Sequence, residues 1–232
     1  MPVLTELASR LATVDRRVAA AAERGGRARS AVTVVAVSKR FDADAVRAAL
    51  HAGHTDFGES RAQELRRKAA DVGDGVRWHF VGRLQRNKVP ELVGLVSLVH
   101  SVDRIELAEA LAARTRAGTN GASARVQRVL IQVNAGEDPR KGGCRVADAP
   151  ALVAAVRQLD GLACEGLMTV PPMGEDPRPV FARLRRLRDE LCARFPEVVQ
   201  LSMGMTDDFE VAIEEGATIV RVGEAIFGPR PA

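Results

Sequence analysis

Short runs of apolar residues alternate along the chain with longer segments of mixed polarity. The run 32–38 is largely β-branched and apolar, which is typical of a strand buried on both faces of a parallel sheet. Similar runs recur, and the segments between them carry apolar residues at helical spacing. The predicted strands are 32–38, 55–58, 76–81, 95–101, 126–133, 162–168, 198–202 and 218–222.

The segments between the strands predict helices, with Asp42 and Asp103 as caps of two of them. The predicted helices are 3–24, 43–51, 59–70, 86–93, 104–116, 150–159, 179–194 and 207–215. Residues 119–123 predict a loop, and the polar, glycine-rich segment 135–145 predicts a mobile one.

Strands that alternate with helices indicate an α/β fold. We predict one domain over residues 1–232, a (β/α)8 TIM barrel with an extra N-terminal helix in residues 1–25 packed on it. An open, doubly wound sheet is the alternative.

The composition limits the class of protein. A chain of 232 residues that is 46% hydrophobic can form one sizeable core. No run is apolar enough to cross a bilayer and no signal peptide is apparent, so we expect no membrane association. The three cysteines are widely spaced without a C-x-x-C pair, which fits a reducing cytoplasm.

The charge balance favours a solvated surface over a nucleic-acid interface. Lysine and arginine exceed aspartate and glutamate by four, and both signs are spread along the chain. Aromatic residues are 3% of the chain and tyrosine is absent, so platforms for stacking single-stranded bases are scarce. We therefore expect no nucleic-acid partner.

Lys39 stands directly after the 32–38 strand. A lysine is seldom fully buried, and at a strand end it can keep its stem in the apolar wall while its amine reaches solvent. The alternative is a Schiff-base lysine, because a desolvating pocket lowers the amine pKa and frees the nucleophile. The strand alone does not decide between them.

Residues at the carboxyl ends of barrel strands face a common mouth, where phosphate sites often lie in the loops after strands seven and eight. The candidates at these ends are Lys39, Glu59, Ser60, His79, Asn134, Met168, Ser202, Met203, Gly204, Arg221, Gly223 and Glu224.

Gly204 and Gly223 allow backbone N–H groups to approach an anion closely, and the Ser202 hydroxyl can add a donor. Taken alone, these glycines indicate tight turns. Together with Lys39 they place an imine-forming amine and an anion cradle at one barrel mouth. Pyridoxal 5′-phosphate (PLP) carries both an aldehyde and a phosphate, and it is therefore the predicted cofactor.

Arg221 lies late in the eighth strand and keeps its proton under ordinary conditions. If it donates to the pyridine nitrogen of PLP, that nitrogen stays unprotonated and the ring is a weaker electron sink. Such a cofactor suits racemisation or simple carriage better than transamination. An ion pair of Arg221 with Glu59 or Glu224 is the alternative.

Other polar residues are weaker candidates. His79 is either a core histidine with bonded ring nitrogens or a neighbour of the ligand ring. His51 and His54 have no third ligand nearby, so we expect no metal. Asp207 and Asp208 open the last predicted helix, where the helix dipole favours acids.

Several short stretches between residues 36 and 228 match the motifs of one family. They are Ala36-Val37-Ser38-Lys39, Phe57-Gly58-Glu59, Trp78-His79-Phe80-Val81-Gly82 with Leu84-Gln85 and Asn87-Lys88, Gly166-Leu167-Met168, Leu201-Ser202-Met203-Gly204-Met205, and Val220-Arg221-Val222-Gly223 with Ile226-Phe227-Gly228. On these motifs the chain resembles the pyridoxal phosphate homeostasis proteins. The fold of that family is similar to the barrel domain of alanine racemase.

The resemblance implies that Lys39 carries PLP as a covalent aldimine and that Arg221 faces the pyridine nitrogen. It also implies that Ser202, Gly223 and Glu224 hold the phosphate, the last two through backbone amides. One stretch departs from the family pattern. Ser60 and Arg61 stand where the family has asparagine and an aromatic residue, so a side-chain contact from position 60 does not follow from the resemblance.

The predicted function is a non-catalytic, monomeric, cytoplasmic PLP carrier that buffers the free aldehyde, maintains vitamin B6 homeostasis and contacts PLP-dependent apo-enzymes transiently. One alternative is a racemase-like PLP enzyme of fold type III. Alanine racemases use a tyrosine from a second domain as the second base, and this chain has no tyrosine, so that route is closed. Another alternative is a class I aldolase that uses Lys39.

Overall fold

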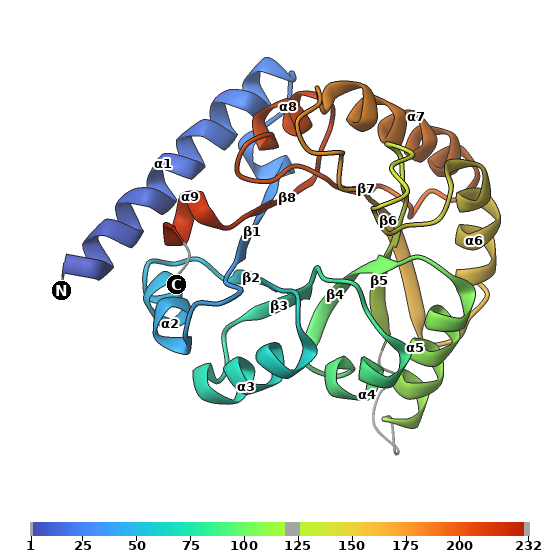
Figure 1. Ribbon diagram of the computed structural model, residues 1–232, viewed down its shortest axis with the longest axis horizontal. Coiled ribbons are helices and arrows are strands. Elements are labelled where there is room, and N and C mark those ends of the chain that lie inside the picture. Colours follow the sequence, from blue (N-terminus) through green and yellow to red (C-terminus); the bar gives the residue numbers. More distant parts are fainter. Residues whose placement is uncertain (1, 119–125, 230–232) are drawn as a thin grey trace.

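The computed structural model describes residues 2–118 and 126–229, which form a closed barrel of eight parallel strands (Figure 1). Each strand pairs with the next in the chain, and β8 pairs with β1. This closure confirms the predicted (β/α)8 barrel, because an open sheet would leave two edge strands unpaired. The strands are β1 Thr33–Val37, β2 Asp56–Glu59, β3 Arg77–Phe80, β4 Val96–Val102, β5 Gln127–Gln132, β6 Leu162–Met168, β7 Gln200–Ser202 and β8 Ile219–Val222.

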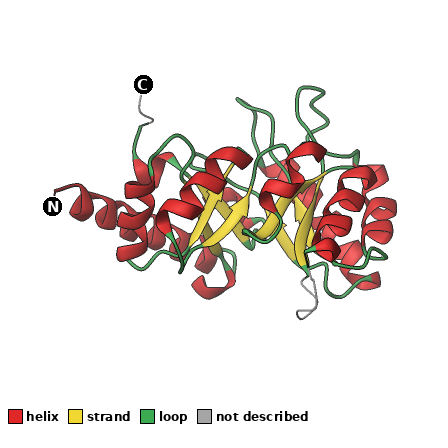
Figure 2. Cartoon of the chain, turned by 90° about the horizontal axis from the view of Figure 1, so that it is seen from below, coloured by secondary structure: helices red, strands yellow, loops and turns green. Residues whose placement is uncertain are grey.

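Helices surround the strands on the outside of the barrel (Figures 1 and 2). They return the chain from the carboxyl end of one parallel strand to the start of the next. The α-helices are α1 Pro2–Arg24, α2 Ala43–His51, α3 Ala62–Val72, α4 Val89–Leu92, α5 Ile105–Ala117, α6 Ala149–Val156, α7 Arg178–Arg194, α8 Phe209–Glu214 and α9 Glu224–Phe227, and the 3-10 turns are η1 Arg29–Ala31, η2 Arg86–Lys88 and η3 Val146–Asp148. Among the described residues, no helix has the length and apolar character needed to cross a membrane.

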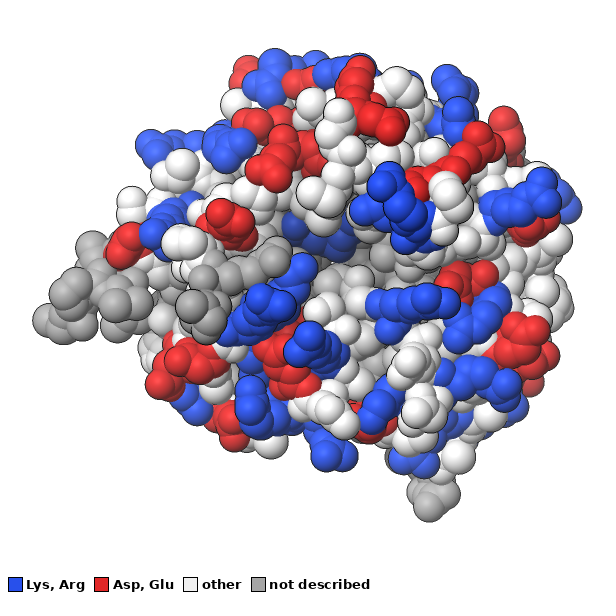
Figure 3. Space-filling model, viewed as in Figure 1, with Lys and Arg blue, Asp and Glu red and all other residues white. Residues whose placement is uncertain are grey.

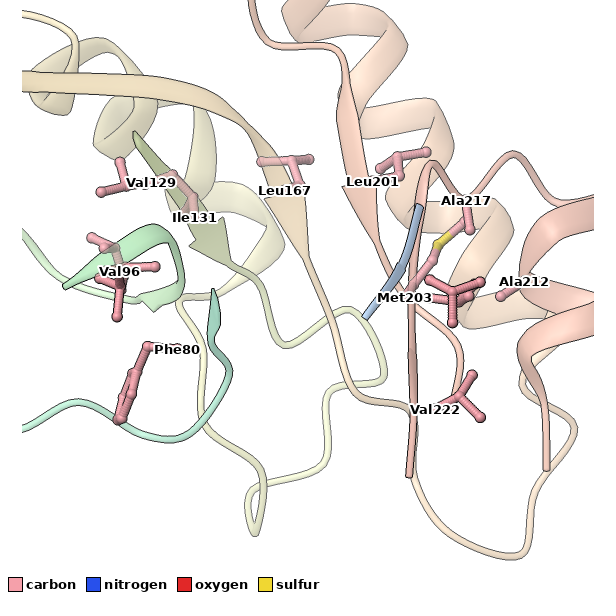
Figure 4. Packing of buried hydrophobic residues seen from close by; sticks show 14 of the residues in the cluster. Phe80, Val96, Val129, Ile131, Leu167, Leu201, Met203, Ala212, Ala217 and Val222 are labelled. Atoms are coloured by element: carbon pink, nitrogen blue, oxygen red, sulfur yellow. The ribbon is translucent and has the colours of Figure 1, made fainter. Parts of the chain in front are cut away.

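The strand side chains fall into two sets because successive residues point to opposite faces. The outward set packs against the helices in one large apolar cluster, in which Figure 4 shows Phe80, Val129, Leu167 and Leu201 from four different strands. The inward set forms a separate small cluster of Val35, Leu98, Leu130, Met168 and Ile219. Since this inner apolar cluster is small, part of the barrel interior is left to polar residues, and the candidate site is built from them.

The extra N-terminal helix α1 runs along α8 and α9 and also contacts α2 (Figure 1). It buries apolar side chains at helical spacing, including Leu7, Val14 and Val18. Arg17 of α1 adds two hydrogen bonds to the Glu210 carboxylate of α8, at 3.0 and 2.9 Å. The described residues thus place this helix on the outside of the barrel, as the sequence predicts.

Two predicted helix starts are wrong. Glu59 is the last residue of β2, because its backbone still pairs with β3, and α3 begins only at Ala62. Asp103 does not cap α5, since Arg104 occupies the N-cap position without a side-chain cap and Asp103 forms an ion pair with Arg104 instead.

Two further segments differ from the prediction. The predicted helix 86–93 consists of the η2 turn followed by the single-turn helix α4, which has a proline in its first turn. The final helix before β8 begins at Phe209, and Asp208 accepts the Met205 N–H at 2.5 Å and makes no cap bond to α8.

The two predicted loops have different outcomes. Residues 119–123 lie outside the described residues. The segment 135–145 is tied to the end of β5, because the Asn134 N–H donates to the Cys144 carbonyl oxygen at 2.9 Å and Arg140 donates to the buried Asp138. Its mobility stays a prediction.

Candidate active site at the barrel mouth

Lys39 lies at the rim of the barrel, two residues beyond Val37, the last residue of β1. β1 is flanked by β2 on one side and β8 on the other. Ser38 is fully buried, whereas Lys39 is half-buried and Arg40 is exposed. The chain therefore leaves the core at Lys39, at the strand end where the sequence predicts this lysine.

Arg221 is the first member of a hydrogen-bonded chain through the barrel interior. Its guanidinium donates to the Ser202 hydroxyl at 2.7 Å. Ser202 Oγ lies 2.8 Å from Nδ1 of His100, and His100 Nε2 lies 2.9 Å from Nδ1 of His79. His79 Nε2 lies 3.2 Å from the Asp56 carboxylate. These five residues, named the interior chain below, come from β8, β7, β4, β3 and β2, so only the closed barrel brings them together.

A proton arrangement in which both histidines are neutral satisfies every bond of this interior chain. Because the Asp56 carboxylate only accepts, His79 must donate to it through Nε2. A neutral His79 then accepts at Nδ1 from His100, and a neutral His100 accepts at Nδ1 from the hydroxyl of Ser202. Ser202 Oγ in turn accepts from Arg221. Every group has a partner with both histidines neutral.

The electrostatics of the interior chain agree with a neutral His100. Burial, followed by repulsion from His79 and Arg221, lowers the pKa of His100 well below its ordinary value. Burial lowers the pKa of Arg221 to about 10, so the guanidinium stays charged at neutral pH. Burial acts to raise the pKa of Asp56, but hydrogen bonds from His79 and Arg77 outweigh it and leave that pKa well below its usual range. A neutral His100 thus lies between the charged Arg221 and the charged Asp56 at the two ends of the interior chain.

The structure shows which groups bond to two of the candidates, Arg221 and His79. Arg221 does not pair with a glutamate, because it donates to Ser202 and, at 2.9 Å, to the Thr169 carbonyl oxygen. Both ring nitrogens of His79 are engaged, as the core-histidine interpretation expects. Contact between His79 and a ligand stays a prediction.

The methionine candidates lie on opposite faces of the barrel wall. Met168 belongs to the small inner cluster beside Val35 and Ile219. Met203 is fully buried in the outer cluster, where Figure 4 shows it near Ala217. A contact of Met203 with a ligand at the mouth would therefore come from its backbone.

The glycine candidates allow close approaches of the chain. Gly204 has a φ of +92°, and a Cβ there would lie 2.6 Å from the Cβ of Ala212, so this turn requires glycine in order to pack on α8. At Gly223 a Cβ would lie 3.2 Å from the Val37 carbonyl oxygen, which keeps the ends of β8 and β1 close together. The remaining candidates are the half-buried Ser60 after β2 and the exposed Glu224 at the start of α9.

The sequence reasoning missed three members of this arrangement. His100 and Asp56 complete the interior chain, and the Thr169 backbone helps to hold Arg221. A signal for His100 was present, because it stands two residues after Leu98 within one predicted strand and must share its face. Leu98 points into the barrel, and a histidine on that face needs polar partners there.

The face seen in Figure 3 is hollowed at its centre, and lysine and arginine side chains gather around the hollow. A positive rim of this kind attracts anionic ligands. In residues 2–118 and 126–229 no group of three histidine, cysteine, aspartate or glutamate side chains lies in reach of one metal ion.

Comparison with known proteins identifies the family. Residues 10–231 match the model of the alanine racemase N-terminal domain. A pyridoxal phosphate homeostasis protein of Aquifex aeolicus is 43% identical over 226 residues, which are 95% of this chain and 97% of that protein. The chain belongs to this family. Its member from Pseudomonas aeruginosa is 40% identical over 228 residues, covering 98% of this chain and 97% of that protein.

A solved structure supports the same assignment. The structure of PipY from Synechococcus elongatus with PLP bound has a TM-score of 0.82 and 34% sequence identity to this chain. The match covers 96% of this chain and all of PipY. The predicted resemblance to the homeostasis family and the alanine racemase type of barrel are thus confirmed.

Proposed function

We propose that this protein binds PLP covalently through Lys39 and carries it without a catalytic activity of its own. The observation that carries the proposal is that one barrel mouth combines the rim lysine with the buried, charged Arg221. The relatives add support, since curated members of the family are named homeostasis proteins and PipY has been solved with PLP. Transient delivery of PLP to apo-enzymes by a monomer belongs to the same proposal.

The described residues fit a ligand of this chemistry. Lys39 supplies an amine at the rim, Arg221 supplies a positive charge that is only 5% exposed, and Gly223 supplies backbone at a close approach of two strand ends. PLP, when bound, supplies an aldehyde that reacts with amines and a ring that withdraws electrons. The other residues that we propose for the site are Ser60, His79, Met168, Ser202, Met203, Gly204 and Glu224.

The same residues favour carriage over catalysis. If Arg221 faces the pyridine nitrogen, its charge at neutral pH opposes a proton on that nitrogen and so weakens the ring as an electron sink. No tyrosine is available anywhere in the chain as the second base of an alanine racemase type of reaction. Both features leave binding intact while removing chemistry that a catalyst would need.

The test is the visible spectrum of the purified protein with PLP, followed by borohydride reduction and peptide mapping over its four lysines. We expect a yellow protein whose reduced label maps to Lys39. Lys39→Ala should fold and stay colourless, because the residue lies at the rim and outside the packed core. Lys88→Ala, which removes a lysine paired with Glu91, is the matched control and should label normally.

The possible results separate the alternatives. A protein that stays colourless with added PLP would overturn the binding proposal. A yellow protein that turns over amino acids would retain PLP binding and overturn the proposal of a non-catalytic carrier.

A further inference from the structure

A charged cluster lies buried beside the backbone that carries Lys39, outside the interior chain. It consists of Glu59 at the end of β2 and of Glu64 and Lys68 on α3. Glu59 is 0% exposed and Lys68 is 1% exposed, and the Glu64 side chain is 14% exposed. Charges this deeply buried are costly unless they are paired and hydrogen-bonded, so the local structure must hold them in place.

Lys68 links the members of the cluster. Its ammonium lies 2.6 Å from Oε1 of Glu59 and 2.8 Å from Oε1 of Glu64. Its third donor is directed at the backbone, where it bonds the carbonyl oxygen of Ser38 at 2.7 Å. An ammonium has three N–H donors, and these three contacts use them all.

The two glutamates hold the residues on either side of Lys39. Glu59 Oε1 accepts the Ser38 hydroxyl at 2.6 Å. Glu64 Oε1 accepts the backbone N–H of Arg40 at 2.7 Å. The cluster therefore forms hydrogen bonds to the residues directly before and directly after Lys39.

The backbone at this point needs such support. Arg40 has a φ of +70°, in the left-handed region that side chains other than glycine rarely adopt. A conformation of this kind persists only where the surroundings impose it, and the bond from Arg40 to Glu64 is part of those surroundings. The turn at Arg40 decides in which direction the chain leaves Lys39 toward α2.

The pKa values of the two glutamates are shifted in opposite directions. Burial raises the pKa of Glu59, and Lys68 and Ser38 act against that shift through their bonds to it. The pKa of Glu64 is lowered, since the bonds from Lys68 and Arg40 outweigh the effect of burial. The Lys68 ammonium thus lies between two carboxyl groups in a site that is largely buried.

We propose that Glu59, Glu64 and Lys68 are positioning residues that fix the backbone from Ser38 to Arg40 and thereby direct the Lys39 amine into the barrel mouth. The inference rests on the proposed function, because it assigns Lys39 the reaction with PLP. In that reaction the unprotonated Lys39 nitrogen bonds to the aldehyde carbon, a C=N bond forms and the aldehyde oxygen leaves as water. Such a reaction depends steeply on the placement of the amine.

The test compares the rate of covalent trapping with stability in the full-length protein. Purified variants are mixed with PLP, reduced with borohydride at timed intervals, and the label on each lysine is measured by mass spectrometry. The variants are Glu64→Ala, which removes the acceptor for Arg40, Glu64→Gln, which keeps an acceptor oxygen, and Lys68→Met. Leu65→Ala is the stability control, because Leu65 is fully buried on the same helix and is not part of the cluster. Arg67→Met, at an exposed neighbouring position, is the control for Lys68→Met.

We expect Glu64→Ala and Lys68→Met to slow the labelling of Lys39 by about tenfold or more, since small displacements of a reacting group have effects of this size. Glu64→Gln should stay within about twofold of wild type, and Leu65→Ala should lose stability yet label Lys39 at the wild-type rate. If Lys68→Met does not fold, Glu64→Ala and Glu64→Gln decide the question.

The opposite pattern would overturn the inference. If folded Glu64→Ala labels Lys39 at the wild-type rate, the cluster serves stability alone. The same conclusion follows if Leu65→Ala also labels Lys39 more slowly, in proportion to its loss of stability. The failure of the proposed function has a different signature, because wild type itself would then carry no label on Lys39, and the positioning role would fall with it.

Discussion

At the scale of single residues, the buried polar groups of the interior chain each have a hydrogen-bond partner. His100 is 0% exposed and His79 is 5% exposed, and an unpaired polar group at such depth is costly. The successive hydrogen bonds of the interior chain, which runs from Arg221 to Asp56, satisfy the ring nitrogens of both histidines when the histidines are neutral. A fully bonded chain of this kind rigidifies the residues that it joins, and Arg221 is thereby held at one defined place.

A pH titration of stability tests this account of His100. The folded protein keeps His100 neutral, whereas the unfolded chain protonates it below a pKa of about 6.5. The unfolded state therefore binds more protons, and the free energy of unfolding contributed by His100 falls as the pH drops below about 6.5, by up to about 1.4 kcal/mol per pH unit. We expect His100→Gln to be less stable than wild type at pH 8 and to lack this part of the slope.

Chemical denaturation of wild type and of His100→Gln between pH 4.5 and 8 measures how the free energy of unfolding of each protein changes with pH. His51→Gln is the control, since His51 is exposed on α2. Equal slopes for wild type and His100→Gln would contradict the assignment of a neutral, buried His100.

At the scale of secondary-structure elements, the junction of β1 and α2 combines the rim lysine with a helix start. Asp42 accepts the backbone N–H of Ala45 at 2.9 Å and so caps α2, as the sequence predicts. α2 then packs through Val46 and Ala49 onto the outside of the barrel. The short segment 38–42 is thus held by α3 on one side and by its own helix cap on the other.

Loss of the cap should destabilise the protein. Asp42→Ala should lower the free energy of unfolding by about 1 kcal/mol, because the first turn of α2 loses its side-chain acceptor. Asp44→Ala, an exposed acid two residues into the same helix, should change it by less than about 0.5 kcal/mol. Urea titration measures both variants, and an equal loss in the two would show that the Asp42 bond is not what stabilises α2.

At the scale of the whole molecule, the closed barrel brings distant segments to one mouth. Lys39 follows β1 and Arg221 lies in β8, yet these two strands are neighbours because the barrel closes between them. The hollow and the surrounding positive side chains in Figure 3 lie on one face of this closed barrel. A ligand that contacts several strand ends should therefore stabilise the fold as a unit.

Thermal unfolding tests this expectation. A ligand that binds only the folded state at 100 times its dissociation constant adds about 2.7 kcal/mol. For a chain of this length we expect PLP to raise Tm by roughly 5–10 °C. Lys39→Ala should lose most of this rise, and inorganic phosphate at the same concentration should produce little of it in wild type. A wild-type Tm that does not move with PLP would contradict binding to the folded protein.

The sequence by itself determined the barrel and the place of Lys39 at a strand end, because both depend on local patterns. Alternating apolar runs and helical periodicity need no information about distant contacts, and a lysine after a buried strand must emerge at its end. Element ends were less predictable. Glu59 belongs to β2 because it pairs with β3. Asp103 does not cap α5, because Arg104 occupies the N-cap position and forms an ion pair with Asp103.

Only the tertiary structure decided the partners of the polar residues. The bond from His100 to Ser202 spans residues that lie far apart in the chain, and the ion pair of Lys68 with Glu59 depends on how α3 packs beside β2. Lys68 stands within a basic stretch that suggests a solvated helix face, yet it is almost completely buried. The physical reason is that burial of charge depends on which groups the fold brings within hydrogen-bond distance, and sequence spacing carries no record of those distances.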